Sequence, residues 1–171
     1  DSHRRQRQMC IRDSYGTEAM HVLRAERGFI IVGQETDGTV SPIDLGMDWI
    51  ISKKKKDFIG KRSLERASMK QNDRKELVGL LSEDPNKVIP EGAHAIDETD
   101  LELEEKNILG HVTSSYFSSN CKRSIAMALI KNGRARKGNK LVIPLLNGDK
   151  IKAKIVNPVF FDPNGVRKNG I

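Results

Sequence analysis

Between residues 75 and 156 the chain carries short apolar segments with a repeat of two residues, and this feature constrains its fold more than any other. Glycine, proline, asparagine or acidic loops separate the six segments, which are KELVGLL, GAHAI, ILGHVTSSYF, RSIAMALI, KLVIPLL and KIKAKIV. Successive side chains of a strand point to opposite faces, so this repeat is typical of β-strands. Six short strands in close succession favour a small antiparallel barrel or sandwich.

Two local patterns refine this prediction. Asn147-Gly148 lies between the last two segments and accepts the positive φ angles that a two-residue hairpin turn requires. In KIKAKIV three apolar residues alternate with three lysines, which predicts a core face and a solvated face whose charges discourage edge pairing.

Ser114 and Ser115 have no base beside them, so packing or hydrogen bonding is favoured over nucleophilic catalysis.

The region before residue 75 has a helical pattern at both ends. Apolar residues at positions 19, 20 and 23 predict a helix over about 15–27, with Ser14 as its N-cap and Gly28 as its stop. A second helix is predicted from about Lys61, and its expected buried side chains are Leu64, Ala67 and Met69.

Between these helices the sequence predicts two strands and a short helix. FIIVG is a short apolar run with β-branched residues and predicts a buried strand, and DWIIS predicts another. Asp37-Gly38 predicts a turn, and Ser41-Pro42 begins a brief helix over PIDLGM. Such a set would leave a sheet face and both edges uncovered, so residues 15–58 are expected to be the end of a larger domain.

The first 14 residues, DSHRRQRQMCIRDS, contain four arginines and almost no apolar periodicity. They resemble translated adapter DNA and are expected to be a non-native or disordered tail, with a natural basic tail as the alternative. The KQNDRK stretch is the best candidate for a domain boundary in the sequence. The expected divisions are therefore 1–14, a domain end over 15–58, a linker helix over 59–75 and a β-domain over 76–171.

Composition narrows the function without identifying it. There are 30 Lys+Arg against 23 Asp+Glu, a net charge of +7, which favours anionic partners, but aromatic residues are only 5%, which argues against a nucleic-acid binder. No run approaches the roughly 20 apolar residues of a membrane span and no signal peptide precedes the fold, so a cytoplasmic location is expected. Two cysteines and four scattered histidines predict neither a disulfide framework nor a metal site.

The stretch YGTEAMHVLRAERGFIIVGQETDGTVSPIDLGMDW, followed by DFIGKRSL, resembles the aminomethyltransferase family, whose founding member is the T-protein of the glycine cleavage system. The shared pattern is Arg-x-Glu at a helix end, a glycine with a polar and acidic turn, Ser-Pro, a glycine, a tryptophan and Asp-Phe-x-Gly. LGHVTSSYFSSNCKRSIAMALI and GRARKGNKLVIP are similar to the family's C-terminal barrel. The resemblance implies an α+β fold, in which the tail of an aminomethyltransferase-type folate-binding domain precedes a small six-stranded antiparallel β-barrel.

Within this family, KKKKDFIGKRSL and PVFFDPNGVRKNG are most similar to α subunits of heterotetrameric sarcosine oxidases. The resemblance implies a C-terminal fragment of such a subunit. The full complex would oxidise sarcosine to glycine, form hydrogen peroxide and transfer the one-carbon unit to tetrahydrofolate, giving methylenetetrahydrofolate. It would contain FAD, FMN and NAD, none of them bound by this fragment. The implied partners are tetrahydrofolate and the β, γ and δ subunits, with neither nucleic acid nor membrane.

The same resemblance implies two folate-binding residues. Glu26 falls at the position of the family's folate-binding glutamate, and a carboxylate with two acceptor oxygens pairs with the adjacent N–H groups of a pterin. Lys55 falls close to a basic residue that the family uses toward the glutamate tail of folate. The alternatives are a surface ion pair for Glu26 and a solvated lysine for Lys55. Trp49 and Phe58 are expected in the core.

No catalytic residue is predicted, because the family's catalytic aspartate belongs to the part of the domain that precedes Tyr15. The fragment alone is therefore expected to be inactive. Other functions stay open: an aminomethyltransferase of the glycine cleavage system, a dimethylglycine-dehydrogenase-like enzyme, or a non-enzymatic basic barrel that binds RNA or a protein. Salt-dependent binding to single-stranded nucleic acid without a response to folate would favour the last.

Overall fold

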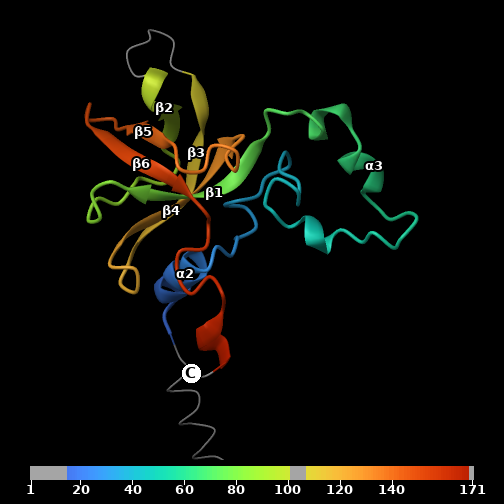
Figure 1. The fold of residues 1–171 in the computed structure, drawn as a ribbon, viewed down its shortest axis with the longest axis horizontal. Helices are drawn as coiled ribbons and strands as arrows, with labels where there is room; N and C mark the ends of the chain where they lie inside the picture. Colours follow the sequence, from blue (N-terminus) through green and yellow to red (C-terminus); the bar gives the residue numbers. More distant parts are fainter. Residues whose placement is uncertain (1–14, 101–106, 170–171) are drawn as a thin grey trace, which may run out of the picture.

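The sheet closes into a six-stranded barrel in the computed structural model, which describes residues 15–100 and 107–169 (Figure 1). Neighbouring strands are antiparallel in the closed order β1-β4-β3-β2-β5-β6. The barrel alternative and all six predicted strands are confirmed, within an α+β fold. The strands are β1 (Lys75–Ser82), β2 (His94–Asp97), β3 (Ile108–Ser118), β4 (Arg123–Lys131), β5 (Lys140–Pro144) and β6 (Lys150–Val156).

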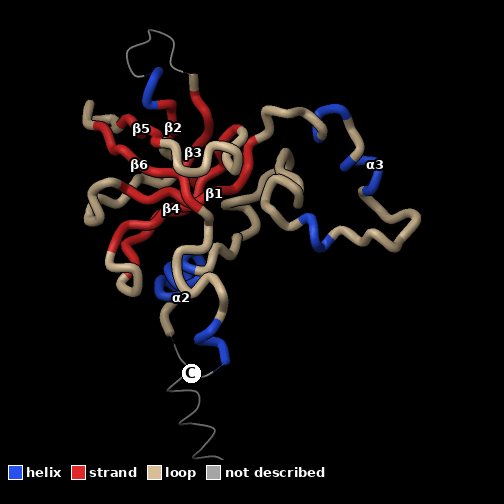
Figure 2. The backbone as a smooth tube through the Cα atoms, in the orientation of Figure 1, coloured by secondary structure: helices blue, strands red, loops and turns tan. Residues whose placement is uncertain are grey.

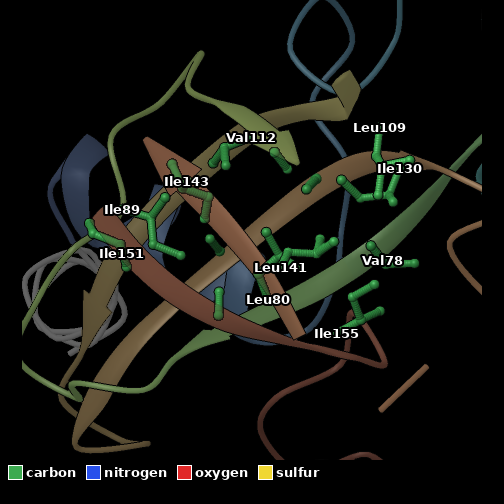
Figure 3. Packing of buried hydrophobic residues seen from close by; sticks show 14 residues of the cluster. Val78, Leu80, Ile89, Leu109, Val112, Ile130, Leu141, Ile143, Ile151 and Ile155 are labelled. Atoms are coloured by element: carbon green, nitrogen blue, oxygen red, sulfur yellow. The ribbon is translucent and has the colours of Figure 1, made fainter. Parts of the chain in front are cut away.

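The barrel interior is filled by the alternate side chains that the period-two pattern predicted. Figure 3 shows this core, in which Leu80, Ile130, Ile143 and Ile155 come from four different strands and are fully buried. The lysines of β6 alternate with its buried residues and are exposed. They do not protect an edge, however, because β6 pairs with both β5 and β1. That part of the prediction is wrong, since closure leaves the barrel without an edge at this strand.

Strand β4 is buried on both faces. Its residues Ala126, Ala128 and Ile130 face the barrel core, whereas Ile125 and Met127 belong to a second apolar cluster outside the barrel. The sequence RSIAMALI lacks polar alternation for this reason, since a strand covered on both faces is apolar throughout.

The predicted hairpin between β5 and β6 is confirmed. Gly148 has φ of +85°, and its N–H donates to the Leu145 carbonyl at 3.1 Å. The Leu145 N–H donates to the Asp149 carbonyl at 2.8 Å and closes the turn. The predicted turn at Asp37-Gly38 also forms, with a hydrogen bond from the Val40 N–H to the Asp37 carbonyl at 3.4 Å.

The first predicted helix forms as α2 (Thr17–Glu26), and Gly28 ends it with φ of +70°. Its predicted apolar face is wrong, because Met20 and Leu23 are 42% and 45% exposed. The buried residues are the last three of the helix, residues 24–26, which lie against the barrel. Ser14 and the predicted tail 1–14 lie outside the described residues.

The segment between α2 and β1 is mostly irregular (Figure 2). FIIVG and DWIIS do not form the predicted strands: the first contributes a single bridge from Val32 to Thr36, and the second contains η1 (Asp48–Ile50). Among the described residues no strand pairs its backbone with either run, so neither run joins a ladder. Trp49, predicted in the core, is 75% exposed, and Phe58 is half-buried.

The predicted helix from about Lys61 is much shorter than expected. It comprises α3 (Lys61–Leu64) and the separate 3-10 turn η2 (Ala67–Met69), and neither contains a buried residue. PIDLGM forms one turn in place of a helix, with the Ser41 hydroxyl accepting from the Asp44 N–H at 3.3 Å. The remaining elements are η3 (Glu98–Asp100) and η4 (Val166–Asn169). No helix within 15–100 or 107–169 is both long and apolar enough to pass through a bilayer.

The irregular segment before β1 and the barrel differ in burial. We therefore expect their amides to differ in protection from hydrogen exchange. No residue from 45 to 76 is buried, whereas β4 is buried along most of its length. Amides of residues 47–73 should exchange within seconds by local opening, and those of β1, β3 and β4 should exchange only through global unfolding. Exchange measured by mass spectrometry tests this, and uniform protection across both parts would contradict it.

Candidate functional site

The polar site of this chain lies at the C-terminal end of α2. Figure 1 shows α2 below the barrel, next to the chain that follows β6. Helix α2 contacts β3 and β4, and the Glu26 carbonyl accepts hydrogen bonds from the Phe160 and Phe161 N–H groups at 2.9 and 3.0 Å. Three surfaces therefore enclose the last helical turn, which explains why Arg24 and Glu26 are both buried although they lie two residues apart.

Glu26, the predicted folate-binding residue, is only 2% exposed. One carboxylate oxygen accepts from the Ser118 hydroxyl at 2.6 Å, and the other accepts from the Asn120 side-chain amide at 2.9 Å. Both partners come from the end of β3 and the turn after it. The alternative of a surface ion pair is wrong, since the side chain is buried and its partners are neutral.

Arg24 forms a buried ion pair that the sequence did not predict. Its Nη1 lies 3.0 Å from the Glu35 carboxylate, and the two side chains are 8% and 0% exposed. Its Nη2 donates to the Ser114 hydroxyl at 2.6 Å and to the Gln34 side-chain oxygen at 2.9 Å. Ser114 and Thr113 also donate to Glu35, whose other oxygen accepts from the Ile31 N–H at 2.7 Å.

This network joins three segments that are distant in sequence: α2, the turn over 31–36 and strand β3. The predicted hydrogen-bonding role of Ser114 and Ser115 is confirmed, because Ser114 bonds both charges and the Ser115 hydroxyl donates to the Ile125 carbonyl at 3.4 Å. Glu35 lies in the QET turn that the family resemblance included, but nothing in the local spacing pairs it with Arg24. Only the tertiary fold brings them together.

The chain after β6 holds the same helix end from the other side. Arg27 lies 3.3 Å from the Asp162 carboxylate and donates to the Phe161 carbonyl at 3.2 Å. Gly28 is required here for space, because a Cβ at this position would lie 2.7 Å from the Pro158 carbonyl oxygen.

A second polar contact docks the irregular segment on the barrel. Arg74 donates to the Asp44 carboxylate at 2.8 Å and to the Thr39 carbonyl at 2.7 Å. The Leu77 N–H of β1 donates to the Asp44 carbonyl at 2.9 Å. Burial acts to raise the pKa of Asp44, but hydrogen bonds from Arg74 and Ser41 outweigh it, so this pKa lies below its ordinary value.

Lys55 lies elsewhere. Its side chain is exposed and lines a hollow of about 390 Å³ together with Pro42, Phe58 and Ile59. Figure 1 shows the segment from η1 to α3 extending away from the barrel, while α2 lies beneath it. Glu26 is not among the residues that line this hollow. Among residues 15–100 and 107–169 no cluster of histidine, cysteine or carboxylate side chains suits a metal ion.

Comparison with known proteins matches both parts of the chain. Residues 75–162 match the family described as "Glycine cleavage T-protein C-terminal barrel domain", and residues 8–55 match "GCVT N-terminal domain". The crystal structure of glycine cleavage system aminomethyltransferase T from Bartonella henselae superposes with a TM-score of 0.72 at 25% identity, covering 85% of this chain and 38% of that one.

The sequence relatives include sarcosine oxidase α subunits and aminomethyltransferases. "Sarcosine oxidase subunit alpha" of Corynebacterium sp. (strain P-1) is 50% identical over 91% of this chain, and that of Rhizobium meliloti (strain 1021) is 39% identical over 90%. The chain spans 16% and 15% of the lengths of these subunits. "Aminomethyltransferase" of Thermotoga petrophila is 30% identical over 85% of this chain, which spans 37% of that protein.

The buried ion pair predicts a large loss of stability on removal of one partner. Arg24→Met leaves the Glu35 carboxylate buried without a cation, and we expect the free energy of unfolding to fall by about 3–5 kcal/mol. Adding Glu35→Gln should restore part of it, because the uncompensated charge is gone. Arg27→Met is the matched control: this arginine is 33% exposed, and its loss should cost about 1 kcal/mol. Urea unfolding measures all three, and equal losses for Arg24 and Arg27 would exclude the role assigned to burial.

The lowered pKa of Asp44 predicts a specific acid sensitivity. Because the folded-state pKa lies below the unfolded value of about 3.9, the carboxylate stabilises the fold above that value and stops doing so as pH falls through the folded pKa. The stability difference between the wild type and Asp44→Asn should be constant above about pH 5 and shrink below about pH 4. Asp48→Asn, at an exposed aspartate, is the control. A difference that stays constant from about pH 5 down to about pH 2 would refute the prediction.

Proposed function

Because this chain belongs to the glycine cleavage T-protein family through its C-terminal barrel domain, we propose that it is the folate-binding part of a sarcosine oxidase α subunit. The observation that carries the proposal is the 50% identity to such a subunit over 91% of the chain. The matches to the N-terminal domain and to the barrel occur in the order that an aminomethyltransferase has, which supports a folate-related role in one-carbon chemistry.

The proposed reaction belongs to the whole complex. Sarcosine is oxidised to glycine while dioxygen is reduced to hydrogen peroxide, and the one-carbon unit passes to tetrahydrofolate as methylenetetrahydrofolate. FAD, FMN and NAD serve the complex outside this chain, and the β, γ and δ subunits are its partners. In this proposal residues 15–58 belong to the folate-binding domain, 59–75 connect it to the barrel, and 76–171 form the barrel domain.

Glu26 is proposed to bind the pterin. A carboxylate offers about four acceptor positions, so the bonds from Ser118 and Asn120 leave one on each oxygen for the pterin N–H groups. Those two bonds fix the orientation of the carboxylate, which favours a bidentate pairing. A pterin also needs access to a side chain that is 2% exposed here, so binding requires an opening at this helix end.

Lys55 is proposed to face the glutamate tail of folate. It belongs to a run of four exposed lysines, residues 53–56, and no ion pair involves this run within the described residues. A flexible ammonium pairs with a carboxylate without the fixed geometry of an arginine. The second candidate function is that of an aminomethyltransferase, which the 30% identity to the Thermotoga petrophila protein favours.

A chimera tests the proposed function. We expect the 157 aligned residues of this chain to replace the matching segment of the Corynebacterium sp. (strain P-1) subunit and to support formation of methylenetetrahydrofolate from sarcosine and tetrahydrofolate. Glu26→Gln in the chimera should lower the apparent affinity for tetrahydrofolate by about tenfold or more, because the amide replaces one acceptor with a donor. Lys55→Gln should weaken binding of polyglutamylated folate more than that of the monoglutamate.

Hydrogen peroxide formation without folate is the internal control, since Glu26→Gln should leave sarcosine oxidation intact. The chain alone should produce no methylenetetrahydrofolate, because none of its residues matches the family's catalytic aspartate. Activity of the chain alone, or a Glu26→Gln chimera with wild-type folate affinity, would disprove the corresponding part of the proposal. Salt-sensitive RNA binding without any folate response would favour the basic binding module instead.

A further inference from the structure

A second hollow, of about 490 Å³, lies where the start of β4 meets the end of β6 and the chain that follows it. This volume is within the range of small-molecule sites, about 300–1,000 Å³. Its lining combines two cations, Arg123 and Lys137, with an apolar floor that includes Ile125, Phe160 and Phe161. No aspartate or glutamate from the described part of the chain lines it.

Arg123 lines this hollow, and its guanidinium is only partly satisfied. Its Nη2 donates to the Ser82 carbonyl at 2.7 Å, while its Nε is buried and has no partner. Within residues 15–100 and 107–169 no carboxylate pairs with it. A guanidinium stays protonated in proteins, so this partly buried charge lacks a counter-charge. An anionic oxygen bound to the guanidinium would supply the missing counter-charge.

The surroundings add positive charge and apolar surface. Lys137 is exposed at the rim, and the guanidinium of Arg167 lies 4.9 Å from the centre of the Phe161 ring. The nearest acidic group along this chain segment, Asp162, is already paired with Arg27. Phe160 is held by close packing on Gly79, where a Cβ would lie 2.8 Å from the ring. The hollow therefore has an apolar floor beneath a cationic rim.

We propose that this hollow binds a small organic carboxylate, with its oxygens on Arg123 and Lys137 and its apolar body on Phe160 and Ile125. A zwitterionic amino acid is disfavoured, because its ammonium would meet two cations and no carboxylate. Neither Glu26 nor Lys55 lines this hollow, and its direct link to Glu26 is confined to the backbone hydrogen bonds of Phe160 and Phe161, so the proposal does not depend on the proposed function and either can fail alone.

Calorimetric titration of the full chain with phenylacetate tests the proposal, with phenylacetamide as the neutral analogue and glycine as the zwitterion. We expect saturable binding of phenylacetate and no binding of phenylacetamide or glycine. Arg123→Gln should weaken it about tenfold or more, through loss of a charge-assisted hydrogen bond. Lys137→Gln should weaken it about threefold, as expected of an exposed charge. Lys150→Gln is the matched control, because this exposed lysine at the distant hairpin should have no effect.

The thiol of Cys121 locates the site, because it lines the same hollow and is free. In a Cys10→Ser background, saturating phenylacetate should slow alkylation of Cys121 by iodoacetamide at least fivefold, and phenylacetamide should not. Thermal unfolding is measured first to establish that each variant is folded. If Arg123→Gln does not fold, the loss of affinity in Lys137→Gln tests the proposal. Equal binding of phenylacetamide, unchanged affinity in folded variants, or unprotected Cys121 would each overturn the proposal.

Discussion

The arrangement of this chain around its barrel depends on the outer face of β4. Ile125, Met127 and Leu129 point away from the barrel interior and are almost fully buried. Leaving such side chains in water costs about 1.5–3 kcal/mol each, so this face must be covered. Ala25, Ile30 and Phe160 cover it, from α2, the chain after α2 and the chain after β6. The positions of all three segments follow from one apolar strand.

That cover carries polar groups into a buried place, and each carboxylate there is matched. Glu35 has an arginine and two hydroxyl donors, and Glu26 has a hydroxyl and an amide. A buried carboxylate without donors would be costly, so the partners from β3 are a condition for docking the helix. The same condition fixes the direction of the Glu26 carboxylate, which is what a site for a planar ligand with two adjacent N–H groups requires.

The sequence predicted those parts whose cause is local. Alternation and turn residues are local, so all six strands, the β5–β6 hairpin and the Gly28 helix stop are correct. FIIVG and DWIIS do not form the predicted strands because a strand needs a partner strand for its backbone hydrogen bonds, and residues 29–74 contain none. The predicted burial of Met20 and Leu23 is wrong because the barrel contacts the end of α2 and not its side. The Glu35–Arg24 ion pair was not predicted because it depends on β3, which lies about 80 residues later in the chain.

The distribution of the remaining charge bears on where ligands bind. The acidic groups at the end of α2 are satisfied, whereas the lysine run at 53–56 has no carboxylate partner within the described residues. The proposed folate site would therefore combine Glu26 and Lys55 from separate segments of the chain. The segment with Lys55 is joined to the barrel chiefly through Asp44, which binds Arg74 and the Leu77 N–H. That contact fixes how the segment with Lys55 is placed relative to the barrel.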